Sequence, residues 1–204
     1  MRIGLESSFA TRPTTGIGAY LSGLGEALRR RSDVEIVPIN PPARAMISRL
    51  GERANRFTWE ALRSGLAARG EEIDLLHVPL MAVPIGSPVP VVATVHDVIP
   101  YVLPEYRRSR AMQVNLAVSK ARIRHAAAVI APSQHAALDI ENVLGIPAER
   151  IFVTPEAVGD QYRPAESSGS GRLHALGVKQ PYIFNIGGFD VRKNLPMLVE
   201  AFAD

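Results

Sequence analysis

The chain has 204 residues, of which 47% are hydrophobic and 21% are charged, and it contains no cysteine. This composition is ordinary for a globular protein, and the lack of cysteine excludes disulfides, thiolate nucleophiles and cysteine zinc sites. The formal net charge is only +3, from 23 basic and 20 acidic residues. We therefore expect no nucleic-acid-binding surface, because such surfaces need a much larger basic excess.

Short β-branched runs alternate along the chain with longer runs of helical periodicity. In chain order the sequence predicts strands at residues 2–5, 34–39, 74–78, 91–95, 128–131 and 151–153, and helices at 17–31, 53–69, 107–126 and directly after Ser133. This alternation favours a Rossmann-like α/β fold, a mostly parallel sheet with helices on both faces. No secretory signal precedes the first strand, and prolines interrupt the one long apolar region, so we expect a cytoplasmic protein.

A short polar segment, residues 164–171, has the composition of a flexible linker. It divides the chain into a first domain, residues 1–163, and a second segment, residues 172–204. The second segment is too short to form a core of its own. We therefore expect it to be the truncated start of a larger domain.

The second segment contains a run from Tyr182 to Leu195 with the order strand, glycine turn, two cations, helix. Glycines let backbone N–H groups approach a ligand, and a helix N-terminus attracts anions. Cations at that end of a helix oppose its dipole, which indicates an anionic partner. The run predicts a phosphate-binding site formed by Gly187, Gly188, Arg192 and Lys193.

Gly16 and Gly18 lie between the first predicted strand and the first predicted helix, where parallel sheets place ligand loops. A dinucleotide fingerprint would need a glycine at Leu21 and an acid at Asn40, so a nicotinamide- or flavin-dependent oxidoreductase is excluded. Taken alone, the two glycines fit a ligand loop and a simple flexible turn equally well.

The strand at 91–95 leads into Thr94-Val-His96-Asp97, so His96 and Asp97 are expected at the carboxyl edge of the sheet, where ligands bind. The strand alone also fits an Asp97 that caps a turn beside a hydrogen-bonded histidine, and it favours that structural reading. The other histidines lack the spacing of metal ligands, so no metal site is expected.

Five motifs follow one another along the chain: Gly16-Ile-Gly18, Thr94-Val-His96-Asp97-Val-Ile-Pro100, Ile130-Ala-Pro-Ser133, Ile151-Phe-Val-Thr-Pro155 and Gly187-Gly-Phe-Asp-Val-Arg-Lys-Asn194. In this order and spacing they resemble the retaining glycosyltransferases of family 4 (group 1), which have the GT-B fold. The resemblance implies that residues 1–163 form the acceptor-side domain and that residues 172–204 begin the domain for the nucleotide-sugar donor.

The resemblance also implies roles for the residues already singled out. Gly16 and Gly18 match the glycine loop near the donor phosphates and the acceptor, His96 matches the histidine that contacts the transferred sugar, and Asp97 matches its orienting neighbour. Arg192 and Lys193, beside Gly187 and Gly188, match the pair that neutralises the diphosphate leaving group. A nucleotide-diphosphate sugar would be the co-substrate, with no metal or other cofactor.

The chain departs from the family pattern in three ways, of which the first is decisive for activity and the other two are tolerable variations. The family's Glu-x7-Glu element would lie beyond Asp204, so this chain alone is expected to be inactive. Gly188 stands where some members have arginine, and Ala157 where glycine is common. The whole enzyme would transfer a sugar to a glycan or lipid-linked acceptor. The alternatives are a non-catalytic acceptor-binding module, or one half of a split transferase that receives its donor domain from a second chain.

The segment 107–124 carries six cations and no acid: Arg107, Arg108, Arg110, Lys120, Arg122 and Arg124. Such a surface could attract anionic lipid head groups, so peripheral membrane contact is one expectation. The apolar residues of this segment form two narrow stripes rather than one broad face, which favours an ordinary solvated helix instead.

Overall fold

The computed structural model describes residues 1–8, 15–40, 64–159, 162–164, 170–179, 181–188 and 190–203. The chain forms two compact units, Met1–Gly159 and Asp160–Asp204. Most of the predicted linker, 164–171, lies outside the described residues. A domain boundary at that linker therefore stays a prediction.

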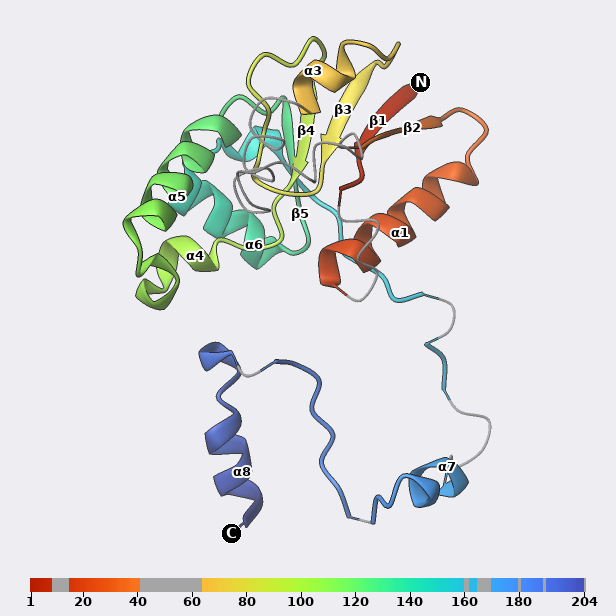
Figure 1. The fold of residues 1–204 in the computed structure, drawn as a ribbon, viewed down its shortest axis with the longest axis vertical. Coiled ribbons are helices and arrows are strands. Elements are labelled where there is room, and N and C mark those ends of the chain that lie inside the picture. The colour runs from red at the N-terminus through yellow and green to blue at the C-terminus, as the bar shows by residue number, and fades with distance from the viewer. Residues whose placement is uncertain are drawn as a thin grey trace, which may run out of the picture. The chain divides into compact units, whose positions relative to one another are not determined.

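The first unit is built on a six-stranded parallel sheet with the strand order β2-β1-β3-β4-β5-β6 (Figure 1). The strands are β1 (Arg2–Glu6), β2 (Glu35–Ile39), β3 (Leu75–Val78), β4 (Val91–Thr94), β5 (Ala128–Ala131) and β6 (Ile151–Val153). All five neighbouring pairs are parallel. The predicted fold class is confirmed, and each predicted strand of this unit is present within about two residues of its expected ends.

Successive side chains of each strand point to opposite faces of the sheet, so the hydrophobic side chains form two clusters, one on each face. One contains Val37, Leu76, Ala93 and Val129, which share one face because they are in register across neighbouring strands. The other cluster contains Leu5 of β1 and Leu21 of the helix α1 (Gly16–Arg29). Leu5 is paired with His77, so His77 points to the α1 face of the sheet.

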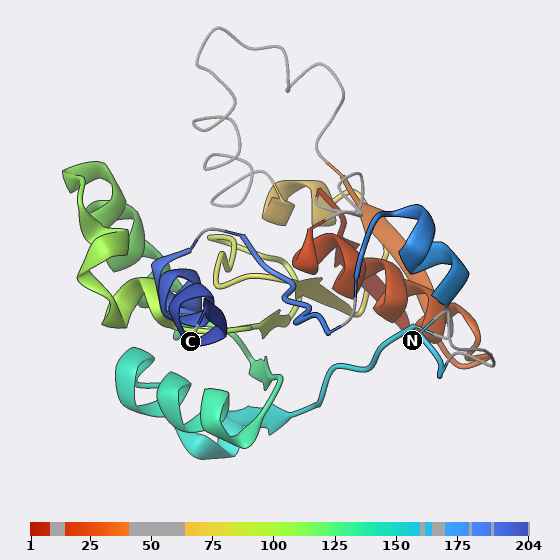
Figure 2. The same ribbon diagram turned by 90° about the horizontal axis from the view of Figure 1, so that it is seen from below.

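Helices cover both faces of the sheet. Figure 1 and Figure 2 show α1 and α5 (Arg110–Ile123) on opposite sides of the strands. Ile123 of α5 is fully buried in the cluster that also contains Ile140 and Leu144. Those two belong to a π-helical turn, Ile140–Leu144, which continues α6 (Gln134–Asp139) and ends at Gly145 in the left-handed conformation.

Serine and threonine caps fix where the main helices begin. The hydroxyls of Thr15, Ser109 and Ser133 accept hydrogen bonds from the third residue of α1, α5 and α6, respectively. Ser109 explains why α5 begins at Arg110 rather than at the predicted position 107. The residues before it form the short helix α4 (Ile99–Val102) and a 3₁₀ turn, Pro104–Arg107.

One predicted element differs from the structure, and one other is only partly within the described residues. Of the predicted helix 53–69, only α3 (Ser64–Ala68) lies within the described residues. The expected strand beginning at Tyr182 is absent from the described residues 181–188. A strand needs a neighbour to complete its hydrogen bonds, and the described part of the second unit contains only α7 (Ser170–Ala175), a 3₁₀ turn at Val191–Lys193 and α8 (Leu195–Ala203).

Candidate functional site

The carboxyl ends of β4, β5 and β6 meet at one edge of the sheet. Backbone pairing continues beyond β4 and β6, because Val95 N donates to Ile130 O at 2.9 Å and Thr154 N donates to Ala131 O at 2.8 Å. The chain therefore leaves the sheet at His96 on one side of β5 and near Glu156 on the other.

His96 and Glu156 form a hydrogen-bonded pair across the end of β5. Glu156 Oε1 lies 2.7 Å from His96 Nδ1. A carboxylate oxygen accepts, so the imidazole donates from Nδ1. Tyr20 of α1 packs against the His96 ring in a T-shaped arrangement with the ring centroids 4.9 Å apart. These two contacts fix the position and the orientation of the ring.

Thr94 connects Tyr20 to a second histidine, His77, by hydrogen bonds. Thr94 Oγ1 lies 2.8 Å from Tyr20 Oη and 2.9 Å from His77 Nε2. Burial, reinforced by the nearby His96, lowers the pKa of His77 to about 4. Burial also raises the pKa of Tyr20, and the Glu156 charge adds to that rise. At neutral pH both rings are therefore uncharged, and they are packed inside the first unit.

Asp97 does not share in this pair. Its Oδ1 accepts a hydrogen bond from Ile99 N at 3.0 Å, which caps the turn that leads into α4. Among the described residues, the acceptor for the His96 ring is Glu156 rather than Asp97. The capping that the strand pattern favoured is thus present, while the sugar-orienting role inferred for Asp97 stays a prediction.

Gly16 and Gly18 lie in the first turn of α1. Gly18 N donates to the capping Thr15 Oγ1 at 3.1 Å, so its N–H is already engaged. Gly16 is exposed, and nothing lies within 4 Å of the place where a side chain would begin. Tyr20, one turn further along, places this end of α1 on the same edge as His96. Residues 9–14, which lead into this helix, lie outside the described residues.

The predicted phosphate site belongs to the second unit. The side chain of Lys193 lies against Gly187, with Cε 3.5 Å from an ideal Cβ position there. Arg192 Nε lies 3.4 Å from Asp190 Oδ1, which also accepts from Arg192 N. Both cations precede α8 in their own 3₁₀ turn, and Asn194 in the left-handed conformation separates that turn from the helix. Gly188 is exposed. Phosphate binding by these four residues stays a prediction.

Sequence reasoning missed Glu156 and Tyr20. Glu156 had a usable signal, because it follows a predicted strand closely, as His96 does, and so belongs to the same carboxyl edge. Tyr20 had none, since its apolar spacing marks it as a core residue of α1. The pairing of His96 with Glu156 depends on β4 and β6 being the two neighbours of β5.

Among the residues that the structure describes, no three histidine or carboxylate side chains gather in a way that could hold a metal ion. The helices of the described residues include none that is long and apolar enough to cross a membrane.

Two solved structures share this fold. A structure of S. aureus MnaA with UDP has a TM-score of 0.53 and 16% sequence identity, covering 85% of this chain and 50% of that one. A structure of Anabaena Alr3699/HepE in complex with UDP and glucose has a TM-score of 0.53 and 21% identity, covering 86% of this chain and 50% of that one. The chain thus spans about half the length of either protein.

None of the curated proteins compared with the chain matches it in sequence. The family model for "Glycosyltransferase Family 4" matches residues 14–161. That match spans most of the chain and four of the five motifs, and it confirms the resemblance to this family. The fifth motif, residues 187–194, lies outside the match. It includes His96, Asp97 and Glu156, as well as Gly16 and Gly18. The chain belongs to glycosyltransferase family 4.

Proposed function

We propose that this chain supplies the acceptor-side wall of a transferase that moves a sugar, with retention, from a nucleotide-diphosphate sugar to a glycan or lipid-linked acceptor. The observation that carries the proposal is the His96–Glu156–Tyr20 cluster at the carboxyl edge of the sheet, where open α/β sheets bind ligands. His96 would hydrogen-bond the sugar while the glycosidic bond loosens. Two proteins of the same fold were solved with UDP, which supports a nucleotide-sugar donor.

The second unit supports a donor domain that is only begun in this chain. Several large apolar side chains are exposed there, including Phe184, Ile186, Met197, Val199 and Phe202. Burial of such side chains is the main favourable term in folding, so this surface fits one that further chain would cover. Arg192 and Lys193 would then face the diphosphate. We propose that this remaining half is supplied either in the same polypeptide or by a second one, and that the reaction needs no metal.

The proposal makes a direct prediction for the 204-residue chain. Transition-state stabilisation needs both walls of the cleft, so the chain alone should not turn over any nucleotide-sugar. Calorimetric titration with UDP- and GDP-sugars should show very weak binding or none. Submicromolar affinity would contradict the proposal and favour a complete donor site within these residues.

A substitution of His96 tests whether this side chain contributes to sugar transfer. In a transferase that joins this domain to a donor half, His96→Ala should lower kcat about 100-fold or more with little change in melting temperature, because the contact acts mainly in the transition state. His135→Ala is the matched control, since that histidine is 88% exposed and lies outside the cluster. Parallel loss of stability and activity in His96→Ala would instead indicate a structural role.

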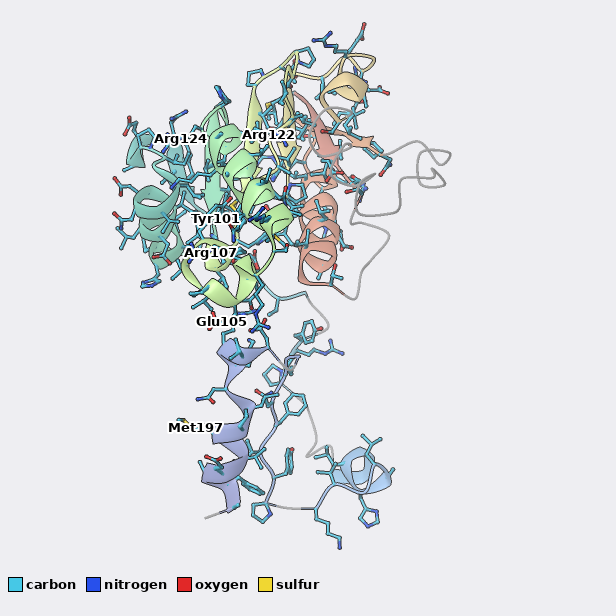
Figure 3. All side chains as sticks on the ribbon, turned by 60° about the vertical axis from the view of Figure 1, so that its left-hand side comes forward. Tyr101, Glu105, Arg107, Arg122, Arg124 and Met197 are labelled. Atoms are coloured by element: carbon cyan, nitrogen blue, oxygen red, sulfur yellow. The ribbon has the colours of Figure 1, made fainter. Side chains whose placement is uncertain are left out.

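We further propose that the protein is cytoplasmic and that it contacts an anionic membrane peripherally through the cations near the start of α5. Arg107, Arg108 and Arg110 are exposed near the start of α5, and Met112 and Val114 beside them are exposed as well. Figure 3 shows Tyr101 and Arg107 near one end of α5 and Arg122 and Arg124 toward the other. Arg122 is buried, at 7% exposed, so it does not add to a basic surface.

A cavity of about 540 Å³ opens beside these cations. Its walls are Tyr101, Pro104, Arg107, Gln113, Leu116, Ala117 and Lys120. Apolar walls with two cations suit the junction between a lipid chain and an anionic head group, which is the chemistry of a lipid-linked acceptor.

Vesicle co-sedimentation tests this contact. The chain should bind anionic but not neutral vesicles, more strongly at low salt, since each cation near the surface contributes about 1 kcal/mol. Replacing Arg107, Arg108 and Arg110 with glutamine should abolish binding. The same change at Arg29, Arg30 and Arg31 should not, because Arg30 and Arg31 are paired with Glu26 and Asp33. Equal binding to both lipids, or to neither, would reject electrostatic attachment.

A further inference from the structure

The His96–Glu156 pair joins two strand ends that are not neighbours. Adjacent strands lie about 4.8 Å apart, so β4 and β6 are about 10 Å apart with β5 between them. The 2.7 Å contact is made only because the imidazole and the longer glutamate side chain reach toward each other across the end of β5. The contact therefore depends on the strand order of the sheet, and it cannot be read from the local sequence around either residue.

The contact determines which imidazole nitrogen carries the proton in the neutral ring. Nδ1 keeps its proton and donates it in a hydrogen bond to the Glu156 carboxylate, so in the neutral ring Nε2 is left as an acceptor. Within the described part of the chain, Nε2 is shielded from solvent and has no hydrogen-bond partner. A shielded polar atom without a partner is uncommon and often marks a functional site. A hydroxyl group of a ligand would supply the missing donor.

Two neighbouring side chains, Tyr20 and His77, are held by Thr94 rather than by Glu156. Tyr20 blocks one side of the ring, and its own hydroxyl is engaged by Thr94. His77 is bound to the same Thr94 and is uncharged at neutral pH, so it does not compete for Glu156. Glu156 is therefore the group that sets the protonation pattern of the His96 ring.

We propose that Glu156 is a positioning residue that holds His96 in its Nδ1–H form and presents Nε2 as a hydrogen-bond acceptor to a hydroxyl of the sugar substrate. The sugar part rests on the proposed function, whereas the tautomer part does not. Glu156 is 45% exposed, and exposed ion pairs add little to stability. Its removal should therefore change the ring and leave the fold intact.

Side-chain ¹⁵N NMR of the 204-residue chain tests the tautomer, with His96 assigned by a His96→Gln variant. At about pH 8, where an ordinary imidazole is neutral, the wild-type chain should show His96 protonated at Nδ1. Glu156→Ala should shift the tautomer ratio toward Nε2–H by about tenfold, the effect of losing one charge-assisted hydrogen bond. Glu156→Gln, whose amide oxygen still accepts, should restore part of the Nδ1–H form.

Glu149→Ala is the matched control, because Glu149 is an exposed glutamate that lies just before β6, whereas Glu156 lies just after it. It should leave His96 unchanged, and all variants should keep the wild-type amide spectrum. An Nε2–H tautomer in the wild-type chain, or the same tautomer in wild type and Glu156→Ala, would overturn the proposal.

A second measurement separates this proposal from the proposed function. In a transferase assembled from this domain and a donor half, Glu156→Ala should lower kcat about tenfold, with partial recovery in Glu156→Gln. An unchanged kcat would overturn the role toward the substrate. A wild-type assembly without any transferase activity would count against the proposed function and leave the tautomer result standing.

Discussion

His77 should make the stability of the first unit depend on pH. It is 6% exposed and lies between Leu76 and Val78 on β3, with its Nε2 2.9 Å from Thr94 Oγ1. Burial, and next the nearby His96, lowers the pKa of His77 from 6.5 to about 4. The folded chain therefore keeps this ring neutral at a pH where the unfolded chain protonates it.

The sign and size of the effect follow from proton linkage. Between the two pKa values the unfolded state binds more protons, so the free energy of unfolding falls as the pH falls. The stabilising contribution is intact above pH 6.5, the unfolded value, and is lost as the pH drops toward about 4. Between about pH 7.5 and about pH 5 the loss is about 2 kcal/mol, a large part of the stability of a typical domain.

Urea unfolding followed by circular dichroism at several pH values measures this loss. His77→Gln keeps a polar group near Thr94 but cannot titrate, so its stability should fall by about 2 kcal/mol less over the same pH range. His135→Gln is the control, because His135 is 88% exposed and should follow the wild-type curve. If wild type and His77→Gln lose stability in parallel, the ring is not kept neutral by the fold and the reasoning fails.

Three further substitutions test the packing and capping that position the site, each by urea unfolding. Ser133→Ala removes the hydroxyl that accepts from Ala136 N at 3.1 Å and should cost about 1 kcal/mol; no loss would mean that water replaces the cap. Gly145→Ala forces a side chain into the left-handed conformation at φ 69° and should cost about 1–2 kcal/mol. Gly23→Ala, in an open position within α1, should instead stabilise by up to about 1 kcal/mol. The same sign in both glycine variants would contradict the backbone argument.

The strands could be predicted because their signal is local. Val91–Thr94 is β-branched and follows proline, and Ala128–Ala131 and Ile151–Val153 are short apolar runs, so their bounds were nearly correct from the sequence. The helix between the first two of these strands, α5, was predicted too long, since its basic and apolar pattern runs across Ser109 without a break. Only the capping bond from Met112 N to Ser109 Oγ shows where α5 begins.

Tertiary contacts decide whether a side chain is buried and whether a segment forms a strand, and the periodicity of the sequence does not show these contacts. Arg122 carries a charge that the sequence assigns to a solvated or membrane-facing surface, yet it is buried in the folded chain. The run from Tyr182 to Ile186 has strand-like composition, but the described residues form no strand there. Composition states what a segment can form, whereas pairing partners decide whether it does so.

The candidate site shows the same limit most clearly. His96 was found because one strong strand ends beside it, and that signal lies within a few residues. Glu156 lies 60 positions further along the chain, and the sequence around it does not indicate His96 as its hydrogen-bond partner. Their contact requires three separate facts: that β5 lies between β4 and β6, that all three run in parallel, and that pairing extends to Val95 and Thr154. Each follows from the tertiary arrangement of the sheet, so the sequence can place Glu156 at the carboxyl edge, but its pairing with His96 is known only from the strand order.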